Sequence, residues 1–234
     1  MTDTQSMRNA AASPRFPAVI LYVRAPRPGR VKTRLAHDIG LRQAAAVYDV
    51  LLGHALDCIR PLHAQARLIL ECADSEDVPL LQLRVAGLAE VRAQSGAGLG
   101  ERMADSFDRV FSEGADAAIL VGSDLPGLHH ALLLQGIGAL RYSDIVLGPA
   151  RDGGYYLIGM RRHNPELFAG VTWSDAATCL QTVRNIDAQQ LSLETLPMLS
   201  DIDTAADLYT WVHAHPEHPI TNAITAVTDS IAQH

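Results

Sequence analysis

Short runs of apolar residues alternate along the chain with longer segments whose apolar positions recur every three or four residues. The short runs are rich in Val, Ile and Leu and predict strands over 18–23, 67–72, 89–94, 117–121, 144–147, 155–160 and 193–196. The longer segments predict helices over 41–62, 99–111, 128–140, 176–188 and 205–213, with a short helix or an irregular connection over 78–85. The pattern is weak from His215 onward, where we expect a tail.

The alternation of strands and helices predicts a single Rossmann-like α/β domain, in which a mostly parallel sheet carries helices on both faces. The strands over 144–147 and 155–160 are joined by a short Asp-Gly-Gly turn, so we expect them to pair antiparallel and the sheet to be mixed. We expect a disordered polar leader over 1–16, the domain over 17–214 and a C-terminal tail over 215–234.

Composition restricts the class of protein. A chain of 234 residues with 48% hydrophobic residues can form one substantial core. Its three cysteines are widely spaced, which argues against a disulfide framework, and no apolar run of about 18 residues predicts a membrane span. We therefore expect a cytoplasmic protein. A net charge of −7 with only 5% aromatic residues argues against nucleic-acid binding.

A basic loop follows the first predicted strand. Five cations and no acidic residue lie within the eleven positions from 24 to 34: Arg24, Arg27, Arg30, Lys32 and Arg34. Lys32 is the only lysine of the chain, and its compact ammonium stands two residues after a Gly-Arg pair and before a threonine, where it can meet phosphate oxygens. The loop therefore predicts an anion site; the alternative is a solvated basic loop.

Two acidic positions are candidates to hold a metal ion beside this anion site. Asp124 follows the apolar run over 117–121, and Asp203, with Asp201 as an alternative, precedes the helix predicted from Ala205. Carboxylates facing a phosphate would repel it unless a divalent cation lay between them, and Mg²⁺ takes such ligands together with substrate phosphates. The alternative is that these aspartates, or Thr204 with Asp207, cap the helices that follow.

Glycine-rich turns supply the remaining candidates. Asp152 begins an Asp-Gly-Gly turn and is able to hold hydroxyl groups or act as a base, although a plain hairpin turn is the alternative. Neither the basic loop nor the glycines at 96, 98 and 100 have the spacing of a Walker loop or of a dinucleotide-binding fingerprint. Trp173 either stacks on a ligand or covers the edge of the core.

Four segments together, PRPGRVKTRLA, GSDLP, GPARDGGYYLIG and DIDTAADL, resemble the bacterial DUF2064 family. These are glycosyltransferase-like proteins of the GT-A, or nucleotide-diphospho-sugar transferase, superfamily. The resemblance extends from about Ala18 to about Trp211, and the KTRLA segment is also similar to the phosphate loop of 2-phospho-lactate guanylyltransferases. It implies a GT-A fold, a nucleotide or nucleotide-sugar donor, a small-molecule acceptor, and Mg²⁺ or Mn²⁺ as the cofactor.

The resemblance also implies roles for individual residues. The metal would be held by Asp124 and Asp203, and the catalytic residues would be Lys32, Asp124 and Asp152. The nucleotide and its phosphates would contact Arg24, Gly29, Lys32, Arg34, Gln94, Gly98 and Gly100, with the last three near the nucleobase. The acceptor or sugar would contact Asp152, Gly153, Gly154 and Tyr155. Many relatives have a lysine in place of Arg24, and the Asp-x-Asp signature is reduced to Ser123-Asp124, so the donor stays open.

Two reactions follow from this interpretation. A glycosyltransferase would release a nucleoside diphosphate, whereas a nucleotidyltransferase acting on a phosphorylated acceptor would release pyrophosphate. A non-catalytic nucleotide-binding module is the alternative from another class. A zinc hydrolase built on His213, His215 and His218 is less favoured, because these residues lie in a Pro-containing tail without clustered cysteines.

Overall fold

The computed structural model describes residues 16–229, and within them one sheet of seven strands forms the centre of the molecule. The strands are β1 (Ala18–Val23), β2 (Arg67–Cys72), β3 (Glu90–Ala93), β4 (Ala118–Gly122), β5 (Ile145–Pro149), β6 (Tyr155–Met160) and β7 (Leu193–Thr195). The helices are α1 (Thr33–Ile39), α2 (Leu41–Ile59), α3 (Val78–Val85), α4 (Leu99–Ser112), α5 (His130–Ala139), α6 (Thr178–Ala188), α7 (Ala205–Ala214) and α8 (Pro219–Asp229), with short 3₁₀ turns η1 (Arg60–Ala64), η2 (Ser75–Asp77) and η3 (Pro165–Phe168).

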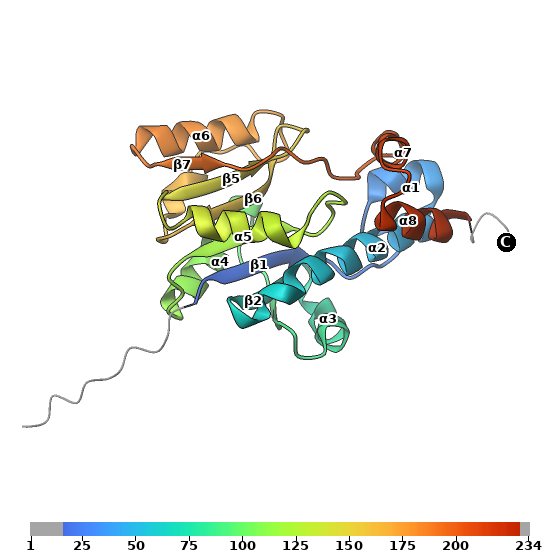
Figure 1. The fold of residues 1–234 in the computed structure, drawn as a ribbon, viewed down its shortest axis with the longest axis horizontal. Coiled ribbons are helices and arrows are strands. Elements are labelled where there is room, and N and C mark those ends of the chain that lie inside the picture. Colours follow the sequence, from blue (N-terminus) through green and yellow to red (C-terminus); the bar gives the residue numbers. More distant parts are fainter. Residues whose placement is uncertain (1–15, 230–234) are drawn as a thin grey trace, which may run out of the picture.

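The strand order is β3-β2-β1-β4-β6-β5-β7. Figure 1 labels five of these strands, β2, β1, β6, β5 and β7, in the same sequence across the sheet. β1 pairs parallel with both β2 and β4, and β2 pairs parallel with β3. β6 pairs antiparallel with β4 and with β5, whereas β7 pairs parallel with β5. β6 is therefore the one strand that runs against the others in the described residues, and the predicted mixed, mostly parallel sheet is confirmed.

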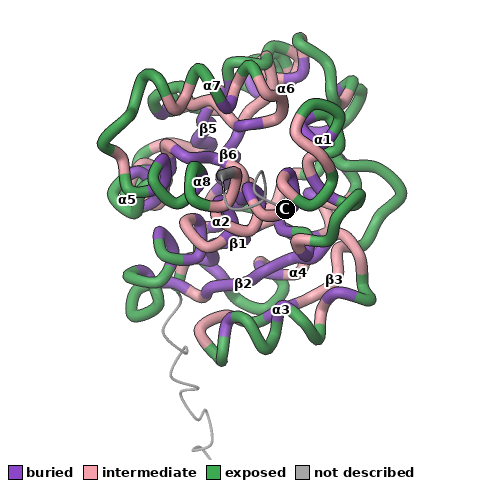
Figure 2. Tube along the Cα trace, turned by 90° about the vertical axis from the view of Figure 1, so that its right-hand side faces the viewer, coloured by how far each residue is buried: buried purple, intermediate pink, exposed green. Residues whose placement is uncertain are grey.

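Helices cover both faces of the sheet, as predicted. Alternate residues of β1 point to opposite faces, so that Val19 and Leu21 join the core under α2, α3 and α5, while Ala18 and Ile20 join the core under α4, η3 and α6. All four side chains are fully buried. Figure 2 shows the buried strands at the centre and the exposed residues on the outer sides of the helices. The nearly continuous apolar strands follow from this burial on two faces.

A third apolar cluster lies at one end of α2, where α1, α7 and α8 gather around it (Figure 1). We expected a weakly patterned tail from His215 onward, but the structure has the helix α8 there. It packs on α2 through Ile220 and Ile224, which are 4% and 1% exposed. α8 has few charged residues, with Pro216 before it and Pro219 as its first residue, so its local pattern is weak, and its stability comes from packing. The leader expected over 1–16 lies outside the described residues except for Phe16.

The helix expected over 41–62 is α2 followed by η1, because Pro61 cannot continue an α-helix. α1 had no counterpart among the predicted elements, since it is only seven residues long and begins inside the basic loop. No helix of the described residues has the length and apolar character that crossing a membrane requires.

Candidate functional site

Several loops meet at the edge of the sheet where the parallel strands end. The loops after β1 and β4 lie there, and so does the start of β6, because β6 runs in the opposite direction. Open α/β sheets bind ligands at this edge. The segment from Leu199 to Asp203 crosses the same edge, held by hydrogen bonds from Leu199 N to Pro149 O at 3.2 Å and from Ile202 N to Asp124 O at 3.4 Å.

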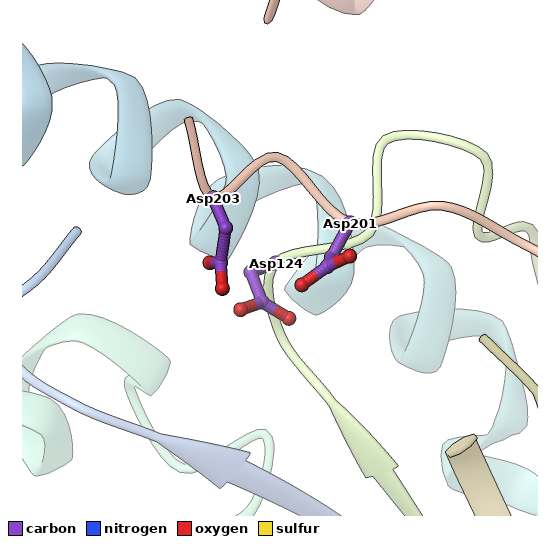
Figure 3. Close-up of side chains that lie close together, drawn as sticks. All are labelled: Asp124, Asp201 and Asp203. Atoms are coloured by element: carbon purple, nitrogen blue, oxygen red, sulfur yellow. The ribbon is translucent and has the colours of Figure 1, made fainter. Parts of the chain in front are cut away.

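Three carboxylates converge at this edge. Asp124 extends from the loop after β4, and Asp201 and Asp203 extend from the segment that leads into α7 (Figure 3). One carboxylate oxygen from each lies within 4.8 Å of the others. This is the one such group of three potential metal ligands in residues 16–229. Carboxylate oxygens are the donors that Mg²⁺ and Mn²⁺ prefer, so the residues present match a hard divalent cation.

None of these aspartates caps a helix, which was the alternative for Asp124 and Asp203. The N-cap of α5 is His129, whose Nδ1 accepts a hydrogen bond from Leu132 N at 3.2 Å. The N-cap of α7 is Thr204, which forms a capping box with Asp207. The carboxylates of Asp124 and Asp203 therefore remain available for other partners.

The ammonium of Lys32 lies between two of the carboxylates. Its Nζ donates to Asp124 Oδ2 at 2.8 Å and to Asp203 Oδ1 at 2.7 Å, and its side chain is only 4% exposed. Burial lowers the pKa of Lys32, but the two carboxylates outweigh it and hold the pKa above its ordinary value. The backbone of Lys32 is left-handed, with φ 47°, a conformation that costs a non-glycine residue of order 1 kcal/mol.

Asp201 makes no such ion pair with another residue of the described part of the chain. Burial, together with the neighbouring charges of Asp203 and Asp124, raises the pKa of Asp201 to about 6, against the opposing effect of Lys32. A second cation would relieve this repulsion. The three carboxylates thus carry more negative charge than the single ammonium neutralises.

Two cavities open on either side of the carboxylates. The first, which we call the basic cavity, has a volume of about 610 Å³ and is lined by the cations Arg24, Arg30, Lys32 and Arg102 together with Gln94 and Tyr48. The second, the acidic cavity, has a volume of about 560 Å³ and is lined by Asp152, Asp175, Asp201 and the ring of Trp173. Tyr22, Leu99, Gly122, Asp124 and Asp203 line both cavities. Asp124 and Asp203 therefore stand at the boundary between the two cavities, and Asp201 lies on the side of the acidic cavity.

Tyr22 lines both cavities, and a hydrogen bond to buried Ser106 holds its hydroxyl group in place. Its hydroxyl shares a hydrogen bond with Ser106 Oγ at 2.7 Å, and Ser106 Oγ lies 2.5 Å from Glu71 Oε2. Burial raises the pKa of the Glu71 carboxyl, whose partner Arg109 lies 3.2 Å away. Tyr48 anchors the other loops, since its hydroxyl accepts from Arg24 N at 3.0 Å and bonds Ser123 Oγ at 2.9 Å.

The arginines of the basic loop have acidic partners that the local sequence did not indicate. Arg24 contacts Asp74 at 3.3 Å and Arg30 contacts Glu76 at 3.7 Å, both largely exposed pairs of the kind that contribute little. Arg27 pairs with Asp77, whose side chain is only 3% exposed, so Arg27 has a structural partner. Arg34 extends from α1 to within 3.7 Å of Asp203 and is 72% exposed.

The glycines proposed for the nucleotide differ in what surrounds them. Gly29 adopts φ +80° in the turn that Arg30 N closes onto Arg27 O, and it is not among the residues lining either cavity. Gly98 is the N-cap of α4, and nothing lies within 4 Å of the position of a Cβ there. Gly100 lies under Trp173, whose ring would be 2.7 Å from a Cβ.

Gln94 and Arg102 line the basic cavity side by side. Gln94 Nε2 donates to Glu71 O at 3.0 Å, and Arg102 Nη1 donates to Gln94 Oε1 at 3.4 Å. Arg102 was not among the predicted residues. It lies on α4, eight positions after Gln94, and no local motif marks it.

The Asp152 turn is also a structural turn, as its alternative interpretation stated. Asp152 Oδ1 accepts from Gly154 N at 2.9 Å, and Ala150 N donates to Gly154 O at 3.0 Å. Gly153, with φ +91°, lies against the protein itself, because a Cβ there would be 2.1 Å from Ala176 O. Asp152, Gly154 and Tyr155 line the acidic cavity, whereas Gly153 does not appear in its lining.

The tail histidines form no metal group with other ligands in the described residues. His215 stacks on Trp211 with ring centroids 3.9 Å apart, and His213 Nδ1 lies 2.7 Å from Tyr209 O. Their environment is that of a helix end packed beside an aromatic ring.

Comparisons with known proteins agree with the fold. The family model described as "Uncharacterized protein conserved in bacteria (DUF2064)" matches residues 55–175. A search of the curated proteins found no match to this chain. Among solved structures, a presumed nucleotide-diphospho-sugar transferase from Desulfovibrio desulfuricans G20 is 31% identical, with 93% of this chain and 96% of that chain covered and a TM-score of 0.83.

More distant structures show similarity of fold alone. A cytidylyltransferase from Leptospira borgpetersenii serovar Hardjo-bovis is 13% identical, with 93% of this chain and 96% of that chain covered and a TM-score of 0.57. The manganese complex of Rv0371c from Mycobacterium tuberculosis H37Rv is 18% identical, with 86% of this chain and all of that chain (100%) covered and a TM-score of 0.50. The expected fold of nucleotide-diphospho-sugar transferases is thereby confirmed.

Proposed function

This chain belongs to the DUF2064 family, and on that basis we propose that it is a metal-dependent transferase that uses a nucleotide donor. The resemblance drawn from its four motifs is thus confirmed at the level of the family. The observation that carries the proposal is the meeting of a cation-lined cavity with a second cavity at three carboxylates. The presumed activity of the 31% identical Desulfovibrio protein supports it.

In this proposal the basic cavity binds the donor. Lys32, Arg24, Arg30 and Arg102 compensate the charge of the phosphates, and Gln94 stands beside Arg102, where it is able to hydrogen-bond a nucleobase. Gly98 leaves open space at the start of α4, and Gly100 supports Trp173. Gly29 contributes through the turn that presents the loop, and Arg34 acts from the rim.

Asp124 and Asp203 would hold a Mg²⁺ or Mn²⁺ ion, and Asp201 is close enough to join them. Such an ion, when bound, supplies positive charge beside the phosphates where the leaving group develops negative charge. Lys32 contacts both carboxylates now, so it has to share or leave them when a metal binds. Because Lys32 also lines the basic cavity, its ammonium is able to contact the phosphates of a bound donor.

The acidic cavity would bind the acceptor. Asp152 and Tyr155 line it, with the backbone of Gly154 between them. Asp152 Oδ1 is engaged by Gly154 N, which leaves Oδ2 to accept a proton or a hydroxyl hydrogen bond. Gly153 would act indirectly, by allowing the turn to pack on Ala176.

Isothermal titration calorimetry tests the nucleotide and metal parts of this proposal. We expect one nucleoside triphosphate or nucleotide sugar from a panel to bind the wild-type chain with Mg²⁺ or Mn²⁺. Asp124→Asn and Asp203→Asn should each weaken that binding at least about tenfold, because each removes a metal ligand. The control is Asp116→Asn. Asp116 precedes β4, at the opposite end of the strand from Asp124, so this substitution should leave the affinity unchanged.

If no nucleotide binds, or if both site variants bind it as well as the control does, the proposal is wrong. A non-catalytic binding module would bind nucleotide without turnover against any acceptor. Where turnover occurs, the product identifies the reaction: a nucleoside diphosphate indicates glycosyl transfer, and pyrophosphate indicates nucleotidyl transfer.

A further inference from the structure

The two cavities carry opposite charge although they share a wall. The basic cavity contains four cationic side chains and two carboxylates, Asp124 and Asp203. The acidic cavity contains those same two carboxylates and three more, Asp152, Asp175 and Asp201. Among the described residues that line it, the only cation is Arg34, which lies beside Asp203 and is mostly exposed to solvent. A divalent ion on the shared carboxylates would still leave the acidic cavity with more negative than positive charges.

Most of the remaining wall of the acidic cavity is apolar or aromatic, with Ser174 and Thr178 as further polar residues. Its walls include the rings of Tyr22, Tyr155, Tyr156 and Trp173 and the side chains of Leu99 and Met103. Leu99 is 42% exposed, so this part of the apolar wall is open to solvent. Tyr155 and Trp173 pack edge to face in this wall, with ring centroids 6.4 Å apart.

A phosphorylated or carboxylated acceptor would be repelled here. In the basic cavity each phosphate meets several cations, whereas an anion in the acidic cavity would face five carboxylates across a space of about 560 Å³. A neutral hydroxyl group would instead find carboxylate oxygens that accept its hydrogen bond, and an ammonium group would find charge compensation.

We propose that the acidic cavity selects an uncharged or cationic hydroxyl compound with an aromatic or aliphatic body, and excludes phosphorylated and carboxylated acceptors. This inference rests on the proposed function, since it takes the basic cavity as the donor site. It favours glycosyl transfer over the nucleotidyl transfer described above, because that nucleotidyl reaction requires a phosphorylated acceptor.

The reaction step then balances without a further reactant. The acceptor hydroxyl oxygen forms a bond to the anomeric carbon of the sugar, and the bond between that carbon and the diphosphate oxygen breaks. The electron pair leaves with the diphosphate, so that a nucleoside diphosphate is the product. The hydroxyl proton passes to a carboxylate of the acidic cavity, for which Asp152 is placed, and from there to solvent.

Three probes that share a phenylethyl group test the selectivity: 2-phenylethanol, 2-phenylethylamine and 2-phenylethyl phosphate. Their dissociation constants are measured by ligand-observed NMR titration of the full chain with Mg²⁺ and saturating inorganic pyrophosphate, which keeps the phosphate probe out of the basic cavity. We expect the alcohol and the amine to bind, and the phosphate ester to bind at least about tenfold more weakly, because several unit charges repel it at close range.

A pair of charge-removing substitutions tests whether the carboxylates cause this selectivity. Asp152→Asn with Asp175→Asn removes two charges, yet each amide oxygen is still able to accept the turn hydrogen bond, from Gly154 N and from Ala177 N respectively. In this variant the ratio of the dissociation constants of the phosphate ester and the alcohol should fall about fivefold or more. The control is Asp187→Asn, which removes an exposed charge on α6 outside the cavity. It should leave the ratio of the two dissociation constants unchanged.

A phosphate ester that binds as tightly as the alcohol would overturn the inference, and so would a ratio of the two dissociation constants that the Asp152/Asp175 variant does not change. Folding of the variants is checked by circular dichroism, and each single variant is measured beside the double one. The proposed function fails separately, if no nucleotide binds in calorimetry. Nucleotide binding together with an unselective acidic cavity would leave the proposed function standing and remove only the acceptor class.

Discussion

Lys32 is the residue whose environment says most about the site. It is a buried cation in a left-handed backbone conformation, and it contacts two carboxylates that come from other parts of the chain. Backbone strain of this kind persists where the surrounding structure enforces it, and it gathers at functional sites. The position of Lys32 indicates that it holds Asp124 and Asp203 together, since two carboxylates at that spacing would otherwise repel each other.

Replacing Lys32 should have opposite effects on metal and on nucleotide. In Lys32→Met the carboxylates lose their ammonium, so Mn²⁺ alone should bind at least about tenfold more tightly than it binds the wild-type chain. The nucleotide found in calorimetry should bind more weakly with the metal present, because a cation is lost from the basic cavity. Calorimetric titration of each ligand measures both effects.

Arg162→Met is the matched control, because Arg162 is an exposed cation far from the carboxylates, beyond the end of β6. It should change neither affinity. Weaker binding of Mn²⁺ to Lys32→Met would contradict the role assigned to Lys32, since the ammonium would then support the metal site instead of competing with it.

At the scale of elements, one carboxylate connects β7, the last strand in the sheet order, to its neighbour β5. Asp144, just before β5, accepts from Ser192 N at 3.0 Å and from Ser192 Oγ at 2.6 Å, and it pairs with Arg161 at 2.7 Å. These contacts join the short strand β7 to β5. The hydrogen bonds from Ser192, followed by the charge of Arg161, hold the pKa of Asp144 below its ordinary value.

Asp144→Asn should therefore lower stability in a pH-dependent way. A pKa that is lower in the folded state contributes stability above the unfolded pKa of about 3.9, and this contribution is lost as the pH falls through the folded pKa. At pH 7 we expect the variant to lose about 1–2 kcal/mol of unfolding free energy, because an amide group does not accept from both Ser192 and Arg161. Urea denaturation at pH 7 and at pH 3 measures this difference.

At pH 3 the difference between Asp144→Asn and the wild-type chain should shrink, since Asp144 is then largely protonated in the unfolded state and increasingly so in the folded state. Asp187→Asn is again the control and should change stability little at either pH. An equal loss at both pH values would mean that packing, and not the charge of Asp144, is responsible.

At the scale of the whole molecule, the site joins segments from both halves of the chain. Lys32 stands 92 positions before Asp124 and 171 positions before Asp203. The segment from Leu199 to Asp203 leads directly into α7, which packs with α1, α2 and α8 in the third apolar cluster. Ligands that contact all three residues should therefore stabilise the entire fold, and not only a local loop.

The thermal midpoint should report this coupling. Nucleotide and Mg²⁺ together, at about one hundred times the dissociation constant, should add about 2.7 kcal/mol by mass action. For a domain of this size that corresponds to a rise of about 5–10 °C. EDTA should reverse most of the shift, and Asp124→Asn should show little of it, whereas a shift that survives EDTA would mean that the metal is not required for binding. Differential scanning calorimetry provides the measurement.

The positions of the strands and helices followed from the sequence, because apolar periodicity records which faces of an element are buried. β1, β2 and β6 have the predicted bounds, and the antiparallel pair around the Asp152 turn was expected from its length. α8 was not predicted, because the packing of Ile220 and Ile224 on α2 is a contact between distant segments. Local pattern carries no record of such a contact.

For the candidate site, the residue types and their place after strands could be read from the sequence, since parallel strands end at one edge of the sheet. Only the tertiary structure decided which of them meet. It placed Asp201 beside Asp124 and Asp203, Lys32 between two of these carboxylates, and the segment from Asp74 to Asp77 against the arginines of the basic loop. Charges far apart in the chain interact only through the distances that folding sets, so no local motif contains them.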